Sequence, residues 1–338
     1  MKKIAVIKII VFSCLALVLC FVLGFAIKGT TVNSLAKSYG SYRYADANLY
    51  ESLSLNTEQI FDKSEISSIK IYWVGGNINI YNSSTDKVSF SERIHETDVE
   101  EKYYVHYALV KKVLTIRFCA STWNIEKNIR ESKDLDIYLP NHKFSTIHIE
   151  TVSANIYYDG EDRENLYSLS LKSVDGNIDL YDTSIKSLKI DESKGSVYMS
   201  NLKSETISIN EISGDVKGKD IITNKMTMNF SSSNIDLKGQ INKYITDGLS
   251  GSSKVKFENV PEEIQGKFNS TVVVIEIPNN DGFTATLKTS TGAIKTEYDG
   301  TIIKERKGLK KIYTLKYLNE SKQYNFESVS SNILIEMK

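Results

Sequence analysis

The side chains that could perform acid–base or metal chemistry are few and scattered in this sequence. Its four histidines are His95, His106, His142 and His148. None of their spacings matches a zinc site, and the sequence has no His-Glu-x-x-His or paired-cysteine pattern. It also lacks a Gly-x-Ser-x-Gly elbow and a phosphate loop with Gly-Lys-Ser/Thr. We therefore expect no metal and no cofactor, and we expect His106 and His148 to lie on strand surfaces rather than act as bases.

A repeated pattern determines where all these residues must lie. It reads apolar-x-apolar, six residues, then Ile or Val, x, and another apolar residue. Clear copies are Leu169-x-Leu171 with Ile178-x-Leu180, and Leu188-x-Ile190 with Val197-x-Met199. The central copies recur at roughly 19–22 residues, in the range of solenoid repeats, and the alternation within each half is that of a strand with one buried face. The pattern predicts an all-β, single-stranded β-solenoid, similar to a parallel β-helix, of about nine or ten rungs.

A corner of small residues separates the two halves of each repeat. Gly, Asn and Asp tolerate positive φ, so we expect a sharp turn at each corner. We also expect the stacked Asn side chains to bond from rung to rung, a structural role that explains them better than ligand binding does. The corner and ladder residues are Gly76, Asn77, Asn155, Gly176, Asn177, Gly195, Gly214, Asp215, Asn234, Gly292 and Asn332.

The outward column beside the repeated Ile or Val tests the hypothesis of an enzyme, because some β-solenoids are polysaccharide lyases or glycosidases. The column mixes charges of both signs with aromatic residues: Asn79, Tyr157, Asp179, Tyr198, Lys217, Asp236, Lys256, Glu276, Lys295 and Leu334. Asp179 and Asp236 should lie several rungs apart, too far to form the carboxylate pair of a glycosidase. We therefore predict a protein that is not an enzyme, and a glycan lyase or hydrolase is the least favoured alternative.

The N-terminus predicts a membrane anchor. Residues 9–27 form an apolar run without a charged residue, long enough to cross a membrane once. Lys2, Lys3 and Lys8 place residues 1–8 in the cytoplasm. A cleaved signal peptide is the alternative, with Gly24-Phe25-Ala26 as the nearest match to a cleavage site. We expect a single-pass protein of the cell membrane with a tether at 28–62 and an extracytoplasmic solenoid at 63–338.

Both ends of the solenoid depart from the repeat. Residues 87–136 carry longer and more charged strands, which we interpret as an irregular antiparallel excursion that caps the N-terminal end of the stack. Such a cap is needed because an open sheet edge invites aggregation. Val255, Ile275 and Ile294 continue the column of repeated Ile or Val residues. Residues 308–338 should likewise pair back as a final set of strands.

The charge, cysteine and tyrosine content limit the classes of partner that the protein could bind. The formal net charge is zero, which argues against nucleic acid. Cys119 is the only cysteine outside the apolar run, so we expect a buried thiol and no internal disulfide. Exposed tyrosines could bind sugars or proteins, although their preference for strands explains much of this usage. The tyrosines in question are Tyr39, Tyr42, Tyr44, Tyr50, Tyr103, Tyr104, Tyr107, Tyr157 and Tyr158.

Several of these segments resemble the DUF4097 family of bacterial β-strand-repeat proteins, often called adhesins and related to the head domains of autotransporter adhesins. The similar segments are Gly75-Gly76-Asn77-Ile78, Leu135–Pro140, the corners at 173–178 and 213–216, and Ile275–Pro278 with the Thr289–Gly292 corner. The resemblance covers residues 66–338 and implies a fold without catalytic residues. It implies an interaction module of the cell envelope that contacts a glycan or a membrane protein. The alternative is an accessory or sensor protein in envelope-stress signalling, a process with which some relatives are associated.

Overall fold

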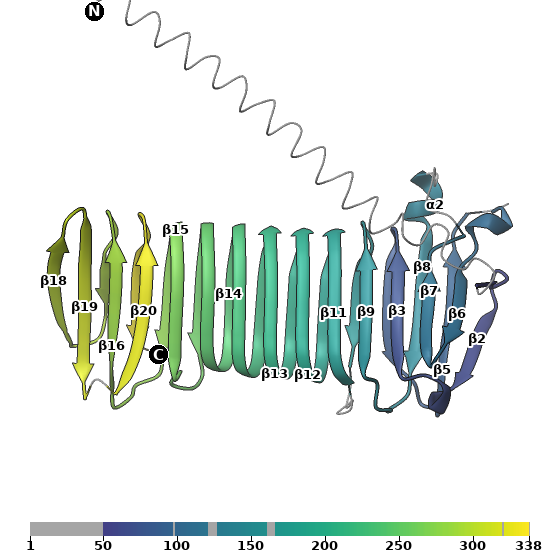
Figure 1. The fold of residues 1–338 in the computed structure, drawn as a ribbon, viewed down its shortest axis with the longest axis horizontal. Coiled ribbons are helices and arrows are strands. Elements are labelled where there is room, and N and C mark those ends of the chain that lie inside the picture. The colour runs from purple at the N-terminus through teal and green to yellow at the C-terminus, as the bar shows by residue number, and fades with distance from the viewer. Residues whose placement is uncertain (1–49, 97–98, 121–126, 161–165, 320, 338) are drawn as a thin grey trace, which may run out of the picture.

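The computed structural model describes residues 50–96, 99–120, 127–160, 166–319 and 321–337, which form one elongated stack of strands (Figure 1). The predicted all-β, solenoid-like fold is confirmed. The membrane span expected at 9–27 lies outside the described residues, as do the tail at 1–8 and most of the tether. Among the residues that are described, no helix is long and apolar enough to cross a membrane.

The middle of the rod is built by three long strands that pass through successive turns without interruption. They are β12 (Ile178–Lys194), β13 (Val197–Ser213) and β14 (Asp215–Phe257). Neighbouring turns pair in parallel, so that Ile178 lies beside Val197 and Val197 beside Val216. All three side chains are buried, whereas the residue after each of them faces solvent at least in part. The period-2 alternation of the sequence therefore gives the observed inward and outward faces.

Toward the N-terminal end, the order of the rungs departs from the order of the chain. β9 (Thr146–Thr151) and β10 (Asn155–Asp159) follow β11 (Leu166–Asp175) and β12 in the stack, and β3 (Ser68–Trp73) and β4 (Asn77–Asn82) lie beyond them. The next parallel rung comes from residues later in the sequence, β7 (Val113–Arg117) and β8 (Lys133–Leu139). The segment expected as an antiparallel excursion thus supplies one parallel rung as well.

An antiparallel cap closes this end. β5 (Lys87–Ile94) pairs with β8 and β2 (Glu58–Asp62) pairs with β5, while β6 (His106–Val110) pairs with β7 and β1 (Glu51–Ser52) with β6. β1 and β2 belong to the 28–62 segment expected as a tether, so its described end is part of the sheet. Short helical turns at Lys63–Glu65, Glu101–Tyr103 and α2 (Lys127–Glu131) connect these strands.

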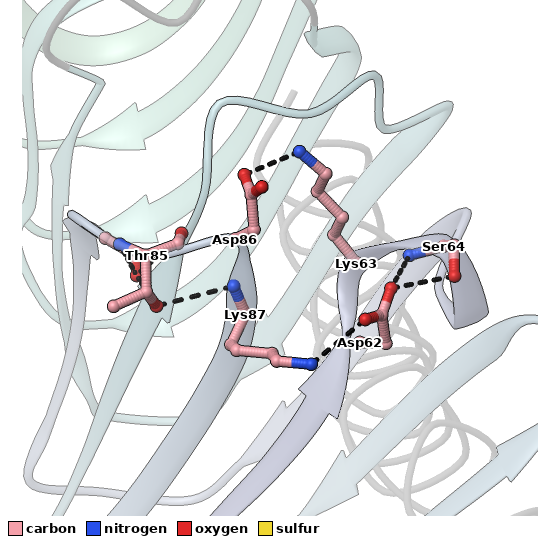
Figure 2. A network of polar contacts seen from close by, with 7 residues as sticks. Asp62, Lys63, Ser64, Thr85, Asp86 and Lys87 are labelled. Atoms are coloured by element: carbon pink, nitrogen blue, oxygen red, sulfur yellow. Dashed lines mark hydrogen bonds and ion pairs between the residues drawn. The ribbon is translucent and has the colours of Figure 1, made fainter.

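A polar network fastens the outer edge of this cap (Figure 2). Lys63 Nζ lies 2.6 Å from Asp86, and Lys87 Nζ lies 3.0 Å from Asp62. The carboxylate of Asp62 also accepts hydrogen bonds from the backbone N–H and the hydroxyl of Ser64, at 3.0 and 2.8 Å. These hydrogen bonds hold the pKa of Asp62 below its usual range. The edge strand β2 is thereby lined with paired charges, which disfavour pairing with another chain.

A buried ion pair joins the cap to its first parallel rung. The side chains of Lys133 on β8 and Glu92 on β5 are in contact and almost wholly inaccessible to solvent. Lys133 Nζ also donates to the carbonyl oxygens of Tyr103 and Phe118, while Glu92 accepts from the N–H of Val105 at 2.8 Å. Burial lowers the pKa of the Lys133 ammonium. Because a buried charge is costly without its partner, this pair fixes how the cap sits on the rod.

The C-terminal end corrects the expected order of rungs. β15 (Glu263–Ile277) is followed in space by β20 (Lys322–Ser328) and β21 (Asn332–Met337), and only then by β16 (Gly282–Thr289) and β17 (Ile294–Thr296). The prediction that 308–338 forms the final strands was therefore wrong for β20 and β21, which lie inside the rod. β19 (Lys310–Leu318) and β18 (Thr301–Lys307) pair antiparallel beyond β16 and form the outer end (Figure 1).

The inward and outward register can be tested at two neighbouring residues of β12. Ile178→Asp should lower the free energy of unfolding by more than about 3 kcal/mol, because it places an unpaired carboxylate in the apolar core. Asp179→Ala should change it by less than about 0.5 kcal/mol, because this side chain lies on the outer face. Urea denaturation measures both values. Equal losses in the two variants would show that the register is wrong.

Candidate functional site: corners, buried acids and a tyrosine ladder

The glycines of the first corner form a file in which successive rungs approach closely. A Cβ on Gly195 would overlap the carbonyl oxygen of Gly176, and one on Gly214 would overlap that of Gly195. Gly292 meets the carbonyl oxygen of Ser331 in the same way. Positive φ was the expected reason for these glycines, yet among the predicted corner glycines only Gly76 adopts it, with φ of 77°; Gly251, which lies against Ser233 in the same file, has φ of 103°. Close packing of backbone on backbone explains the others.

The predicted corner amides connect neighbouring rungs in two separate groups. In the first, Asn155 donates to the side chain of Asn77 at 3.1 Å, and Asn155 accepts from the N–H of Asn177 at 3.0 Å. In the second, Asn234 donates to Asp215 at 3.1 Å. Asn332 stands apart from both groups and accepts from the N–H of Ala293 at 3.1 Å. These contacts run from rung to rung, so the corner amides join the stack.

A second corner, which the sequence analysis did not single out, carries the positive φ angles. Asp182, Asn201 and Asp220 have φ of 45°, 52° and 55° and occupy equivalent places in three successive rungs. Asn201 donates to the carboxylate of Asp182 at 2.6 Å. Asp and Asn enter this conformation more readily than other residues with a side chain. The signal was present as an acidic or amide residue at a constant interval.

Two buried glutamates form the most unusual electrostatic feature of the rod. Glu192 and Glu211 lie in register on adjacent rungs, and each is only 2% exposed. One oxygen of Glu192 accepts from the N–H groups of Ser193 and Lys194, both at 3.1 Å, and Glu211 accepts from that of Ser213 at 3.2 Å. Burial raises the pKa of both carboxyls, and the charge of Glu192 helps to raise that of Glu211 to about 8. The two cannot both be ionised at neutral pH without a large cost.

Five tyrosines form a continuous ladder on the outer face of successive rungs. Successive ring centroids lie 5.4–5.8 Å apart along the series Tyr138, Tyr81, Tyr157, Tyr181 and Tyr198. Each inner ring has an aromatic neighbour on both sides, and the angles between neighbouring ring planes are 29–52°. Burial is the main cause that raises the pKa of Tyr81, Tyr157 and Tyr181, so these hydroxyls stay neutral.

The structure brings only one of the predicted tyrosines into this ladder, Tyr157. Tyr158, Tyr103 and Tyr107 are buried, and the Tyr107 hydroxyl donates to Glu51 at 2.7 Å. Tyr104 is partly exposed in the cap, and the ring of Tyr50 lies under the guanidinium of Arg117. Tyr39, Tyr42 and Tyr44 lie outside the described residues. Tyr198 was already part of the outward column. Tyr81, Tyr138 and Tyr181 were not singled out, because they lie on separate strands and only the stacking of the rungs brings their rings together.

The residues considered for catalysis lie apart. His148 contacts the hydroxyl of Ser170, His106 contacts the carbonyl of Tyr104, and His95 lies 3.2 Å from Asp134. His142 packs its ring against that of Phe144. Cys119 is buried, as predicted. In the described part of the chain, no three His, Cys, Asp or Glu side chains are placed to hold a metal ion.

Charges in the outward column pair with each other. Glu276 contacts both Lys254 and Lys256, at 2.9 and 2.8 Å. The hydrogen bond from Lys256 is the main cause that lowers the pKa of Glu276. The mixed signs noted in the sequence therefore give cross-strand ion pairs at this point of the column.

The buried acids predict a pH-dependent stability. The folded state holds a proton on Glu211 that the unfolded chain releases above its ordinary pKa of 4.5. The contribution of Glu211 to the free energy of unfolding should therefore be most favourable below about pH 4.5 and should decline as the pH rises toward 8. Glu211→Gln should flatten this decline and raise the melting temperature at pH 8, by removing a cost on the order of a few kcal/mol.

Thermal melting between pH 5 and 9 checks this expectation. The exposed Glu205→Gln on the same strand is the matched control and should leave the slope unchanged. The nearby acids Asp175, which acts on Glu192, and Asp215, which acts on Glu211, remain in both variants and add repulsion. Parallel plots of melting temperature against pH for wild type and Glu211→Gln would refute the proton held on Glu211 in the folded state.

Comparisons with known proteins place this fold. A comparison with curated proteins finds no match. Among solved structures, the chain is similar to a candidate adhesin from Bacteroides fragilis NCTC 9343, with 11% identity, a TM-score of 0.43 and coverage of 83% of this chain and 96% of that one. It is also similar to a candidate cell adhesion protein from Clostridium sporogenes ATCC 15579, with 12% identity, a TM-score of 0.23 and coverage of 83% and 99%. Neither similarity is close enough to carry an argument.

The family comparison is decisive because it spans most of the chain. The model of the family described as Toastrack DUF4097 matches residues 66–336. This range begins at the first buried residue before β3 and ends within β21, so it includes every parallel rung and the strands inserted among them. The resemblance found in the sequence is confirmed, and the chain belongs to the Toastrack DUF4097 family.

Proposed function

We propose that this protein is a non-enzymatic interaction module, held outside the cell membrane by residues 9–27, that contacts a component of the cell envelope. The tyrosine ladder is the observation that carries the proposal. It is a row of five aromatic side chains on the outer face, from Tyr138, which is 38% exposed, to Tyr198. Tyrosine combines an apolar ring with a polar end and is enriched where protein surfaces meet a partner.

The ladder is rigid before any partner arrives. Its rings project from strands that are hydrogen-bonded on both sides, and each inner ring contacts an aromatic ring on each side. Little conformational entropy is therefore lost on binding, which favours affinity for a given contact area. Because the ladder offers a row of aromatic rings and neutral hydroxyls, it suits a flat partner surface with hydrogen-bonding groups.

The surroundings of the ladder favour binding over catalysis. Asp136, beside the first rings, is held by Arg93 at 2.7 Å and by the side chain of Asn79 at 2.8 Å. The oxygens of this carboxylate are engaged by protein partners, so they are poorly placed to contact a substrate. Burial raises the pKa of Asp179, farther along the face, but the structure shows no second carboxylate paired with it among the described residues.

A pull-down from solubilised cell envelope with the full-length chain in detergent tests the proposal. A triple variant carries Tyr81→Ala, Tyr157→Ala and Tyr181→Ala. The envelope material that it retains should fall about tenfold or more below that of wild type, which corresponds to a loss of roughly 1.4 kcal/mol of binding free energy. Tyr313→Ala on β19 is the matched control away from the ladder and should bind as wild type does. Equal retention by the triple variant would overturn the role of the ladder.

The identity of the retained material separates two forms of the function. Retention of cell-wall polymer supports an adhesive module. Retention of one membrane protein without polymer supports the alternative, an accessory protein in envelope-stress signalling. The alternative also predicts that deletion changes envelope-stress transcription rather than adhesion.

A further inference from the structure

A groove with a volume of about 520 Å³ crosses several rungs at the turn between the second half-strand of one rung and the first of the next. This volume lies in the range of ligand sites. The groove is separate from the tyrosine ladder, and no residue is shared between them. Its lining includes Lys143, Tyr167, Lys186, Lys203, Asn224 and Asn242.

Tyr167 on β11 supplies an aromatic face to this groove. Its side chain is 52% exposed, and the ammonium of Lys186 lies 5.0 Å from the centre of its ring. The ladder tyrosines stack on each other, whereas Tyr167 stands beside an open concave surface. An aromatic ring in this position can pack against the apolar face of a sugar.

Three lysines give the groove a positive charge. Lys143, Lys186 and Lys203 are exposed along it, and Glu205 is the only acid in its lining. Glu205 lies 3.8 Å from Lys186 and so accounts for one of the three charges. Lys143 and Lys203 are left to attract an anion. Lys143 and Lys203 act as separate point charges, without the planar fork by which arginine clamps a carboxylate or a phosphate, so they suit single charges distributed along a chain, such as one carboxylate per sugar.

Fixed amides form the floor toward the other end. Asn242 donates to the side chain of Asn224 at 3.1 Å and accepts from Asn259 at 2.8 Å. These contacts hold the amides in one orientation, spaced by one rung along the groove. A regular row of oriented amides suits a ligand with repeated hydroxyl groups that extends along the rod axis.

We propose that this groove binds an anionic polysaccharide, a chain of sugars that carry carboxylates. One sugar ring packs against Tyr167, carboxylates of the chain pair with Lys143 and Lys203, and sugar hydroxyls bond to the amides of Asn224 and Asn242. Lys186 stays between Tyr167 and Glu205 and positions the ring. The site is independent of the ladder and adds a ligand class to the interaction module.

Calorimetric titration of the full-length chain in detergent with polygalacturonate tests the site, because its fully methyl-esterified form is a matched neutral polymer. Wild type should bind the free acid at least about tenfold more tightly than the ester. Tyr167→Ala should weaken binding to the acid about tenfold, through loss of the ring contact. The double variant Lys143→Gln and Lys203→Gln should weaken it to a similar extent and reduce its dependence on salt.

Two controls isolate the groove. Lys295→Gln removes an exposed charge on β17, and Tyr157→Ala removes a ladder ring; both should bind polygalacturonate as wild type does. All variants lie at exposed or partly exposed positions, and unchanged melting curves verify their folding. The envelope pull-down tests the ladder and the titration tests the groove, so a negative result in one experiment does not change the interpretation of the other.

Several results would overturn the proposal. Equal affinity for the acid and the ester would exclude carboxylate recognition. Full binding by both groove variants would place the site elsewhere. Equal affinity for polyphosphate would show that charge alone is recognised, and no binding of polygalacturonate at millimolar sugar concentration would exclude this ligand class.

Discussion

The whole rod depends on parallel, in-register stacking, in which each residue meets its equivalent one turn away. The spacing between strands is about 4.8 Å, so whatever occupies one position must tolerate its own kind at that distance. Glycine on glycine permits the backbone contact at the first corner, from Gly176 to Gly214. The same rule brings Glu192 against Glu211 and Tyr81 against Tyr138, whereas Tyr157, Tyr181 and Tyr198 meet diagonally, because they alternate between two neighbouring outward columns. Favourable and unfavourable pairs therefore arise from one constraint, and the apolar columns between them supply the stability that the acidic pair costs.

The sequence was sufficient to predict what depends on local alternation. The inward positions of Ile178, Leu188 and Val197 follow from period 2 alone, and all are buried. The same alternation places Glu192 on the inward face, although the charge of its side chain suggests an exposed position. The reason for the corner glycines was misjudged because close backbone approach between rungs is a property of the stack, and positive φ is a property of one residue.

The order of the rungs could not be read from the sequence, because a solenoid repeat states that rungs stack and does not state which neighbours which. β7 and β8 stack outside β3 and β4 although they follow them in the chain, and β20 and β21 stack inside β16 and β17. Both exchanges place antiparallel strands at the two ends. The groove was missed for a related reason, since Tyr167, Lys203 and Asn242 come from three turns that only the register aligns.

The order of the rungs at the C-terminal end makes the outer end of the rod depend on β20 and β21. β15 has no parallel neighbour on its outer side until β20 and β21 arrive, and these contain the last described residues of the protein. β16 and the hairpin beyond it rest on that late rung rather than on β15. As the chain is made from its N-terminus, the middle of the rod can build step by step, yet the outer end closes only after residues 322–337 have been made. A chain that still lacks β20 and β21 leaves the outer edge of β15 without a parallel neighbour, and proteases and chaperones can recognise such an unpaired sheet edge.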